Sequence, residues 1–292
     1  MRAKRRDRAV PLKRLIPNML TAAALCCGLA SVHFAIEQNF ERAVIALLIA
    51  AIFDALDGRV ARILHATSPF GAVLDSLSDF LSFGVAPMIV LHQMFLKGTD
   101  VLGLAAVLSY ALCAALRLAR FTAEVAKPPA HPGLSAFFTG MPTPAAAGTV
   151  LIPVMLAVSP VLGKRGWGQT PDWAVIALTL AIALLMVSRV PLFSIKKLRI
   201  PRRGMILFFA SIALVLAAAF KDVYLTLAVI AIAYLALLPV SVLSHRKLRA
   251  RILAETRNGG LADPNQSEET RAGTNPVGDA STVPTGADAG RP

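Results

Sequence analysis

Apolar residues dominate the chain in long runs, which polar or charged residues interrupt at intervals. A helix needs about 20 predominantly apolar residues to cross the hydrocarbon of a bilayer. The runs lack the period-two alternation of strands and are rich in Ala and Leu, which favours helices. Eight segments approach the required length: residues 17–36, 40–61, 75–96, 102–121, 143–162, 173–193, 204–220 and 222–244. The pattern therefore predicts an all-α protein, a polytopic membrane bundle of about eight transmembrane helices.

Composition agrees with a bilayer as the solvent. Of the 292 residues, 56% are apolar and 16% are charged. This apolar content is more than the core of one soluble domain can bury. The net charge of +13 could indicate a nucleic-acid partner, but only 7% of the residues are aromatic and the basic residues stand in short runs between apolar segments. We therefore expect no nucleic-acid binding. Cys26, Cys27 and Cys113 lie inside apolar segments without a spaced pair, so we expect neither disulfides nor a zinc site.

Lys and Arg are distributed unevenly between alternate loops. One set of loops, together with the N-terminus and the residues up to 257, carries twenty-three of them. The other set carries five: Arg42, Lys97, Lys164, Arg165 and Lys221. Because basic residues are enriched on the cytoplasmic side, we expect a protein of the cell's inner membrane with both termini in the cytoplasm. Residues 1–16 would be a basic cytoplasmic segment, 17–250 the transmembrane domain and 251–292 a disordered tail.

Acidic residues are scarce in the transmembrane domain, and four of them lie close together in the sequence. Eleven of the 17 acids precede residue 255, and four of these fall within 26 residues: Asp54, Asp57, Asp75 and Asp79. The first pair is spaced i, i+3 and the second i, i+4, so each pair shares one face of its helix. Since consecutive helices run antiparallel with a rise of about 1.5 Å per residue, Asp54 matches Asp79 in depth and Asp57 matches Asp75. The four carboxylates are predicted to gather at the cytoplasmic end of the bundle.

Four ionised carboxylates at this depth persist only if a cation neutralises them or if they take up protons, and a divalent metal is the simplest explanation. Oxygen ligands without His or Cys suit Mg²⁺ or Mn²⁺, and two such ions would hold a pyrophosphate for displacement at phosphorus. Gly58 and Gly71 would let phosphates approach the backbone and Arg62 would donate to them, although close helix packing and a positive-inside charge are simpler explanations. Arg117 and Arg120, three residues apart in the fourth segment, are candidates to bind a phosphate or a carboxylate; their alternative role is orientation.

These residues form one motif with fixed gaps: Asp54-x2-Asp57-Gly58-x2-Ala61-Arg62-x8-Gly71-x3-Asp75-x3-Asp79. The motif is similar in every fixed position to the signature of the CDP-alcohol phosphatidyltransferases, membrane enzymes of phospholipid synthesis. Within that family, residues 74–87, 117–121 and 138–144 resemble the phosphatidylserine synthases of bacteria and archaea. The opening of the first helix, which contains Asn18 and Thr21, is also similar.

The resemblance implies that CDP-diacylglycerol binds with its pyrophosphate on two Mg²⁺ or Mn²⁺ ions held by the four aspartates. The hydroxyl of L-serine would then attack phosphorus and release CMP, with Asp79 as general base; proximity alone does not rank Asp79 above Asp75. The residues implied for nucleotide and phosphate binding are Gly58, Ala61, Arg62 and Gly71. Further contacts to the lipid phosphate or to serine are expected from Asn18, Thr21, Arg117 and Arg120. Because relatives are usually homodimers, we also expect a homodimer.

Two alternatives remain open at this point. The same chemistry could use another acceptor alcohol, such as glycerol 3-phosphate, inositol phosphate or choline, because the preference for serine comes from the resemblance. The aspartates could also form the transit site of a cation transporter, since intramembrane acids often do. A transporter gives no reason for Gly58, Ala61, Arg62 and Gly71 at fixed gaps.

Overall fold

The computed structural model describes residues 12–125, 138–163, 170–188, 191–192 and 205–237. The chain divides by its internal contacts into residues 1–243 and 244–292, and every described residue belongs to the first unit. Three of the predicted features fall wholly or mostly outside the described residues. They are the basic N-terminal segment up to residue 11, most of the basic loop from 189 to 203, and the tail from 251 to 292.

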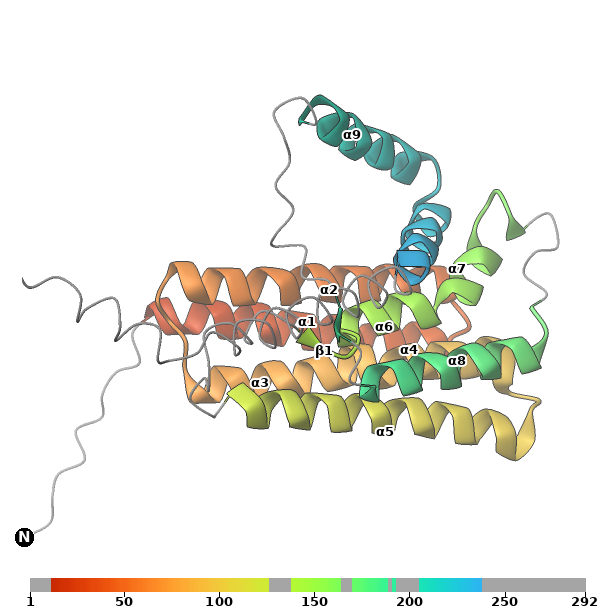
Figure 1. The fold of residues 1–292 in the computed structure, drawn as a ribbon, viewed down its shortest axis with the longest axis horizontal. Helices are drawn as coiled ribbons and strands as arrows, with labels where there is room; N and C mark the ends of the chain where they lie inside the picture. The colour runs from red at the N-terminus through yellow and green to blue at the C-terminus, as the bar shows by residue number, and fades with distance from the viewer. Residues whose placement is uncertain (1–11, 126–137, 164–169, 189–190, 193–204, 238–292) are drawn as a thin grey trace, which may run out of the picture. The chain divides into compact units, whose positions relative to one another are not determined.

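Helices make up nearly all of the described chain (Figure 1). In chain order the elements, with η denoting a π-helix, are α1 (Leu12–Ile36), α2 (Phe40–Ile63), α3 (Pro69–Asp79), η1 (Phe80–Val85), α4 (Ala86–Leu91), η2 (His92–Leu96), α5 (Asp100–Val125), β1 (Phe138–Thr139), α6 (Thr143–Val150), α7 (Ile152–Val158), α8 (Asp172–Val187), β2 (Pro191–Leu192), α9 (Met205–Lys221) and an unlabelled helix, Val223–Leu237. The strands among the described residues are β1 and β2 alone, which pair antiparallel with Phe138 opposite Leu192. The all-α class is therefore confirmed.

Three helical stretches are long and apolar enough to cross a membrane: Leu15–Ile36, Pro69–Leu96 and Val101–Ala123. The α2 helix has 24 residues, but its six charged side chains keep it out of this group. Three further helices are apolar but shorter: Asp172–Val187, Phe209–Lys221 and Val223–Leu237. The structure thus has the helices of a membrane protein, while the number of crossings stays a prediction.

The fifth predicted segment, residues 143–162, is not one continuous helix. It forms α6 and α7, and Leu151 between them has φ −83° and ψ 2°. Pro153 lies in the first turn of α7, where its missing N–H cannot continue the hydrogen-bond ladder of α6. The helix then ends at Val158, and the next residue, Ser159, has an extended backbone with ψ 125°. Hydropathy alone did not reveal this break because both halves are apolar.

A side-chain cap starts α3. The Ser68 hydroxyl accepts a hydrogen bond from the Gly71 backbone N–H at 3.0 Å, and Pro69 occupies the first turn. Ser followed by Pro is a common helix start because the hydroxyl satisfies a free N–H and proline lacks one. The third helix therefore begins at Pro69 and runs through η1, α4 and η2 to Leu96.

The last two predicted segments, 204–220 and 222–244, meet at Lys221 and Asp222. The buried Asp222 carboxylate accepts hydrogen bonds from the Leu225 N–H at 3.0 Å and from the Ser159 hydroxyl at 2.5 Å. The first bond caps the helix that begins at Val223, and the second ties that helix to the end of α7. The boundary between these two apolar segments is thus held in place by hydrogen bonds to a buried carboxylate.

The helices α1, α2, α5, α8 and the stretch from α3 to η2 lie side by side with their axes roughly aligned (Figure 1). Small residues allow close approach between them. Ala35 on α1 and Ala43 and Ala50 on α2 are fully buried. A Cβ added at Gly28 would lie 3.0 Å from the Ser82 Cα atom, so α1 and η1 meet almost backbone to backbone. Small residues at helix contacts are typical of membrane bundles.

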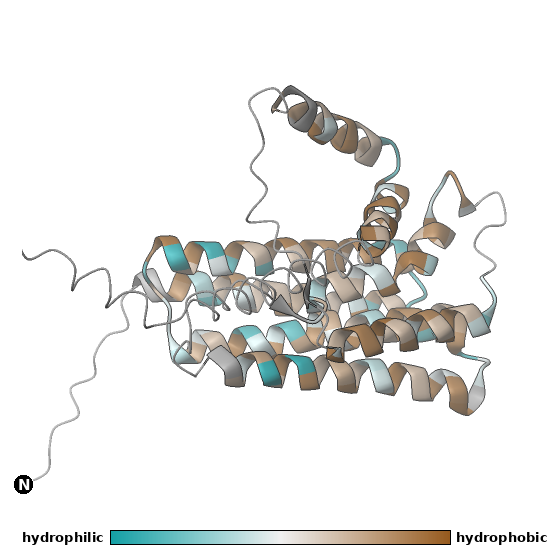
Figure 2. Ribbon diagram, in the orientation of Figure 1, coloured by the Kyte–Doolittle hydropathy of each residue, from teal (hydrophilic) through white to brown (hydrophobic). Residues whose placement is uncertain are grey.

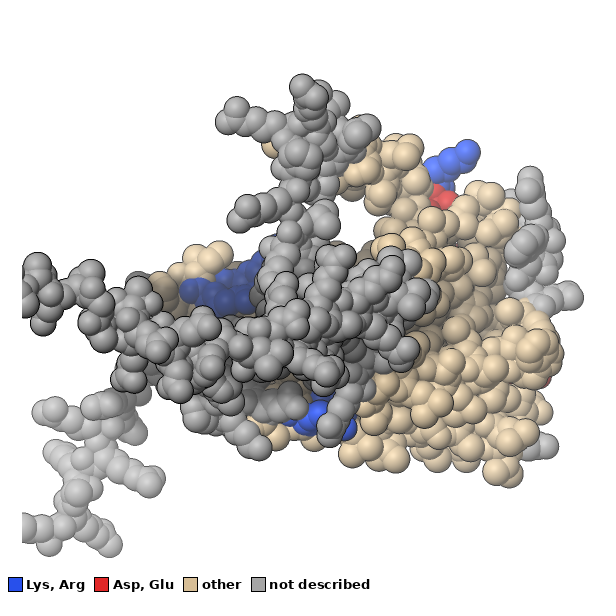
Figure 3. Space-filling view, viewed as in Figure 1, with Lys and Arg blue, Asp and Glu red and all other residues tan. Residues whose placement is uncertain are grey.

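Large apolar side chains point outward from the bundle. On α5, Leu104, Leu108, Leu112 and Leu116 recur every four residues and are 50–61% exposed, so they form a stripe along one face of the helix. Figure 2 shows α5 and α8 as largely hydrophobic over most of their length, and in Figure 3 the surface over this part is nearly free of charge. An apolar surface of this extent is stable against lipid rather than water.

Candidate functional site

The end of α2 and the beginning of α3 bring carboxylates together. Oxygen atoms of Asp54, Asp57 and Asp75 all lie within 4.8 Å of one another. Asp57 is 5% exposed, and the other two side chains are half-buried. Two helices that reverse direction through the short turn of residues 64–68 place these residues at one end of the bundle. Figure 2 shows that hydrophilic positions on α2, α3 and α5 gather toward this end.

Asp79 joins this cluster one helical turn after Asp75. Its carboxyl group is in hydrogen-bonding contact with that of Asp54, as the matching depths of the two residues predicted. Its Oδ1 atom is buried without a hydrogen-bond partner among the described residues. A buried carboxylate oxygen without a donor is costly, so this atom is available to a ligand or a cation.

Thr21 on α1 supports the cluster from a third helix. Its hydroxyl donates to Asp57 Oδ2 at 2.6 Å and also lies 3.1 Å from the Pro17 carbonyl oxygen. The side chain is 4% exposed, so water does not compete for the bond. The Ser78 hydroxyl in turn donates to the Thr21 carbonyl oxygen at 3.3 Å. Thr21 was expected to contact substrate, and the structure engages its hydroxyl with a carboxylate of the cluster.

The π-helix η1 follows Asp79 directly and is fixed on both sides. The Ser82 hydroxyl donates to the Ala24 carbonyl oxygen at 3.3 Å, and the Tyr110 hydroxyl donates to the Phe83 carbonyl oxygen at 3.2 Å. Tyr110 is fully buried. A π-turn leaves backbone groups out of the regular α-helical ladder and is frequent at functional sites. These bonds therefore hold the turn that orients Asp79.

The two motif glycines have different surroundings. A Cβ added at Gly58 would meet no atom within 4 Å, so close helix packing does not explain this glycine. A Cβ added at Gly71 would lie 2.9 Å from Asn18 Oδ1, so the Asn18 amide rests directly on the backbone of α3. Asn18 is thereby placed beside the start of α3, and Gly58 leaves open space on α2.

Arg62 lies in the last turn of α2, one position after Ala61. Its Nε donates to the Gly58 carbonyl oxygen at 2.9 Å, and the side chain is exposed. Ala61 is half-buried. The bond to Gly58 holds the stem of Arg62 along α2, so its charge sits over the same open stretch of helix.

Arg117 and Arg120 on α5 have different partners. Arg117 Nη1 donates to the Thr143 hydroxyl at 2.5 Å, whereas Arg120 Nη1 donates to the Val187 carbonyl oxygen at 3.3 Å, at the end of α8. Arg117 lies within electrostatic range of Asp79. The two arginines were predicted as equivalent candidates, and the structure gives them different neighbours: Arg117 is bonded to the start of α6 and Arg120 to the end of α8. The contact of Thr143 with Arg117 was not predicted, because the position of Thr143 at the start of an apolar segment does not indicate which distant residue it contacts.

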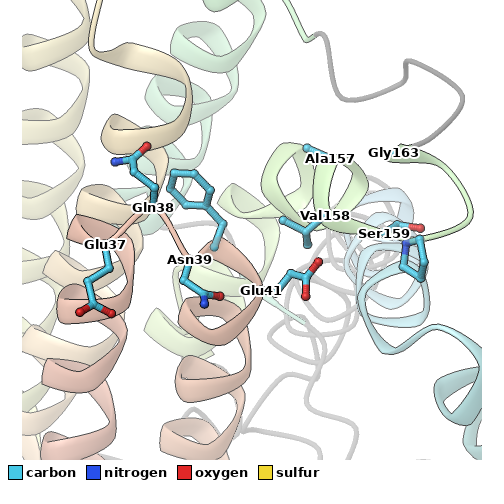
Figure 4. A pocket seen from close by; sticks show the side chains of 10 residues that line it. Glu37, Gln38, Asn39, Glu41, Ala157, Val158, Ser159 and Gly163 are labelled. Carbon is cyan, nitrogen blue, oxygen red and sulfur yellow. The ribbon is translucent and has the colours of Figure 1, made fainter.

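A separate hollow of about 620 Å³ lies between the α1–α2 turn and the end of α7 (Figure 4). Its lining includes Glu37, Asn39, Glu41 and Ser159. Glu41 and Asp57 are sixteen residues apart on α2, which is roughly 24 Å at 1.5 Å per residue. The hollow is therefore at the opposite end of α2 from the carboxylates and is not part of their site.

The carboxylate cluster fits a divalent cation. The donors are all oxygens, their spacing allows one ion to touch three of them, and a fourth buried oxygen on Asp79 has no donor. Such a donor set suits Mg²⁺ or Mn²⁺ rather than zinc. Fold and site together define a helical membrane protein with a cluster of aspartates near one end of its bundle that could hold a divalent metal.

Comparison of the sequence with known proteins identifies the family of this protein. Residues 14–187 match the sequence model of CDP-alcohol phosphatidyltransferases, and the chain belongs to that family. It is 37% identical over 252 residues to the CDP-diacylglycerol–serine O-phosphatidyltransferase of Mycobacterium leprae, covering 86% of this chain and 82% of that protein. The proteins of the same name from Mycobacterium tuberculosis and Bacillus subtilis are 38% identical over 237 residues (80% of each chain) and 32% identical over 182 residues (62% of this chain and 92% of that protein).

Proposed function

We propose that this protein transfers the phosphatidyl group of CDP-diacylglycerol to the hydroxyl of L-serine, giving phosphatidylserine and CMP. The observation that carries the proposal is the convergence of Asp54, Asp57 and Asp75, with Asp79 beside them, on the two helices that bear the family motif. The preference for serine as acceptor is supported by the names of the similar proteins in three bacteria. The transporter alternative lacks comparable support.

The four aspartates would hold two divalent cations, Mg²⁺ or Mn²⁺. When bound, these ions supply charge neutralisation for the pyrophosphate and for the displacement at phosphorus. The structure supports this assignment through the spacing of the oxygens of Asp54, Asp57 and Asp75 and through the contact of the Asp79 carboxyl group with Asp54. The protein itself fixes the orientation of these carboxylates. Thr21 holds Asp57 by a hydrogen bond, and the capped start of α3 sets the position of Asp75 along the helix axis.

Asp79 would act as the general base. It would take the proton from the serine hydroxyl, whose oxygen forms a bond to the phosphorus that carries diacylglycerol. The bond from that phosphorus to the oxygen of CMP breaks, and CMP leaves with the electron pair. Asp79 fits this role because one of its oxygens is buried without a donor, so a proton-bearing group can approach it.

The last turns of α2 and the first turn of α3 would bind the nucleotide end of the substrate. Gly58 faces open space, Ala61 adds only a methyl group, and the exposed Arg62 is held over this stretch by its bond to Gly58. Phosphate groups can approach a backbone most closely at glycine, and a guanidinium is a strong phosphate donor. Asn18 and Gly71 lie beside this region.

The protein would span the cytoplasmic membrane with eight helices and both termini inside. The distribution of Lys and Arg between alternate loops supports this orientation, and the capped boundary at Asp222 supports two separate helices at the end of the domain. The aspartates would then face the cytoplasm, where soluble serine meets a membrane-borne nucleotide lipid. A homodimer is proposed from the family resemblance.

A panel of acceptors tests the proposed function. The purified full-length protein in detergent, supplied with CDP-diacylglycerol and Mn²⁺, is assayed for CMP release with L-serine, glycerol 3-phosphate, inositol phosphate and choline in turn. We expect CMP release with L-serine and product that migrates as phosphatidylserine. Release with glycerol 3-phosphate but not with serine would refute the assignment of serine.

A further inference from the structure

A proline interrupts the hydrogen-bond ladder of the helix that follows Asp79. In a regular α-helix, the N–H of residue i+4 donates to the carbonyl oxygen of residue i. For the Phe83 carbonyl this donor would be residue 87, but Pro87 has no N–H. Just before this point the ladder is shifted by one residue, since the Ala86 N–H donates to the Leu81 carbonyl oxygen five positions back. The Phe83 carbonyl therefore lacks its usual α-helical donor.

Tyr110 on α5 supplies a donor to this carbonyl. Its hydroxyl donates to the Phe83 carbonyl oxygen at 3.2 Å, and both residues are almost completely buried, at 0% and 2% exposed. A buried tyrosine hydroxyl needs a partner, and a carbonyl in an intact α-helical turn already has a donor. The tyrosine hydroxyl thus takes the place of the N–H that Pro87 lacks.

The π-turn sets the direction in which Asp79 points. Asp79 is the last residue of α3, and η1 begins at the next position. One extra residue in a helix turns the part before it by about 100° relative to the part after it, at 3.6 residues per turn. The part after it is anchored, because Ala86, Met88 and Val90 on α4 are fully buried. The direction of Asp79 relative to the core therefore depends on the π-turn.

Close packing encloses η1 between α1 and α5. A Cβ added at Gly84 would lie 3.1 Å from the Ala114 Cβ atom on α5, and one added at Gly28 on α1 would lie 3.0 Å from the Ser82 Cα atom. Interiors packed this densely transmit small displacements instead of absorbing them. A change in the register of η1 is therefore passed along the helix to α3.

We propose that Tyr110 is a positioning residue for Asp79, which it holds in its direction through the Phe83 carbonyl and the π-turn. The inference rests on the proposed function, because it takes Asp79 to be the base at the acceptor hydroxyl. Loss of the Tyr110 hydroxyl removes the donor to the Phe83 carbonyl. The turn then leaves its register, and the Asp79 carboxylate is displaced from the reacting atoms.

Tyr110→Phe tests the proposal, because phenylalanine keeps the ring and removes only the hydroxyl. The full-length protein in detergent is assayed for CMP release with CDP-diacylglycerol, L-serine and saturating Mn²⁺. We expect kcat to fall roughly 10- to 100-fold, the range for a displacement of about 1 Å between reacting groups. KM for both substrates should stay unchanged, because the variant removes no group that binds them.

A double-mutant cycle with Asp79→Asn distinguishes positioning from a general structural effect. If Tyr110 acts through Asp79, adding Tyr110→Phe to Asp79→Asn should lower kcat no further. A residue that supports the whole fold would lower kcat by the same factor in both backgrounds. That result would overturn the inference.

Pro87→Ala tests the hydrogen bond itself. The alanine brings an N–H that can donate to the Phe83 carbonyl, so Tyr110→Phe should lower Tm less in Pro87→Ala than in the wild type. Equal losses of Tm in the two backgrounds would show that the hydroxyl does not replace this N–H, and the inference would be wrong.

Two further variants complete the experiment. Tyr224→Phe removes a hydroxyl that donates to the Glu41 carbonyl oxygen, at the opposite end of α2 from the aspartates, and should leave kcat unchanged; an equal fall there would count against a specific role of Tyr110. Gly84→Ala keeps the Tyr110 hydroxyl but presses η1 away from Ala114, and it should lower kcat at unchanged KM. Gly84→Ala replaces Tyr110→Phe if the latter does not fold, and a wild-type kcat would then refute the inference.

The outcomes separate the inference from the proposed function. If the wild-type protein releases CMP with serine and Tyr110→Phe has the same kcat, the inference is wrong and the function stands. A rise in KM at unchanged kcat would place Tyr110 in substrate binding and also overturn the inference. If the wild-type protein does not use serine at all, the proposed function fails first.

Discussion

The bond between Thr21 and Asp57 permits a quantitative prediction about the metal site. Both side chains are nearly inaccessible to solvent, at 4% and 5% exposed, and the hydroxyl lies 2.6 Å from Asp57 Oδ2. Thr21→Val removes this donor at nearly constant volume. The main effect is therefore on the orientation and charge of Asp57 and not on packing.

The expected magnitude follows from the burial of this bond. A hydrogen bond to a charged group contributes about 1.5–3 kcal/mol, and 1.4 kcal/mol corresponds to a factor of about ten. Loss of a residue that orients a metal ligand typically costs about 10- to 100-fold in metal affinity or activity. We therefore expect the Mn²⁺ concentration for half-maximal activity to rise by roughly 10- to 100-fold in Thr21→Val.

The assay is CMP release as a function of Mn²⁺ concentration at saturating CDP-diacylglycerol and serine. Thr21→Ser should behave like the wild type because it keeps the hydroxyl. Thr179→Val, which removes an equally buried hydroxyl bonded only to the Val175 carbonyl oxygen of its own helix, controls for loss of a buried hydroxyl. A Thr21→Val protein with wild-type Mn²⁺ dependence and normal folding would refute the supporting role of Thr21.

Three further outcomes are expected. Asp79→Asn should lower kcat at least about 100-fold, as loss of a general base does; CMP release at the normal rate would contradict its role. Chelation of divalent cations with EDTA should abolish CMP release, and Mn²⁺ or Mg²⁺ should restore it where K⁺ does not; full activity after chelation would remove the metal from the mechanism. Gly140→Ala should destabilise the protein by about 1–3 kcal/mol, because alanine is strained at φ +89° and collides with Met186. Thermal unfolding in detergent measures this loss, with Gly148→Ala, which meets no atom within 4 Å, as the neutral control.

Local features of the chain predicted most of the helices. Three local features have consequences within a few residues: the long apolar runs, the Ser68–Pro69 start of α3, and Asp222 between two apolar segments. The prediction of one helix over residues 143–162 was wrong, because α6 and α7 are separated at Leu151. Hydropathy values do not record that proline lacks a backbone N–H. Long apolar runs also do not reveal how long each helix is in the fold, and among the described residues only three stretches are both long and apolar enough to cross a membrane.

The register of the aspartates was likewise contained in the sequence. Helical spacing fixes which residues share a face, and a short turn fixes the direction of the second helix. From these two facts the proximity of Asp54 to Asp79 follows, and the structure contains it. The roles of Gly58, Ala61, Arg62 and Gly71 stay predictions.

Pairings between distant segments were decided by the tertiary structure alone. Thr21 meets Asp57 and Thr143 meets Arg117 across separations of 36 and 26 residues, and no local spacing encodes such pairs. They depend on how closely the helices pack, and the size of the side chains at each contact sets that distance. Gly28, for example, has no Cβ and lets α1 approach Ser82 closely. The sequence by itself determined that four carboxylates share one end of two helices, because helical period is a local property. Which hydroxyl holds Asp57, and which partner each arginine meets, depended on packing between helices, because contact between distant segments is a property of the whole bundle.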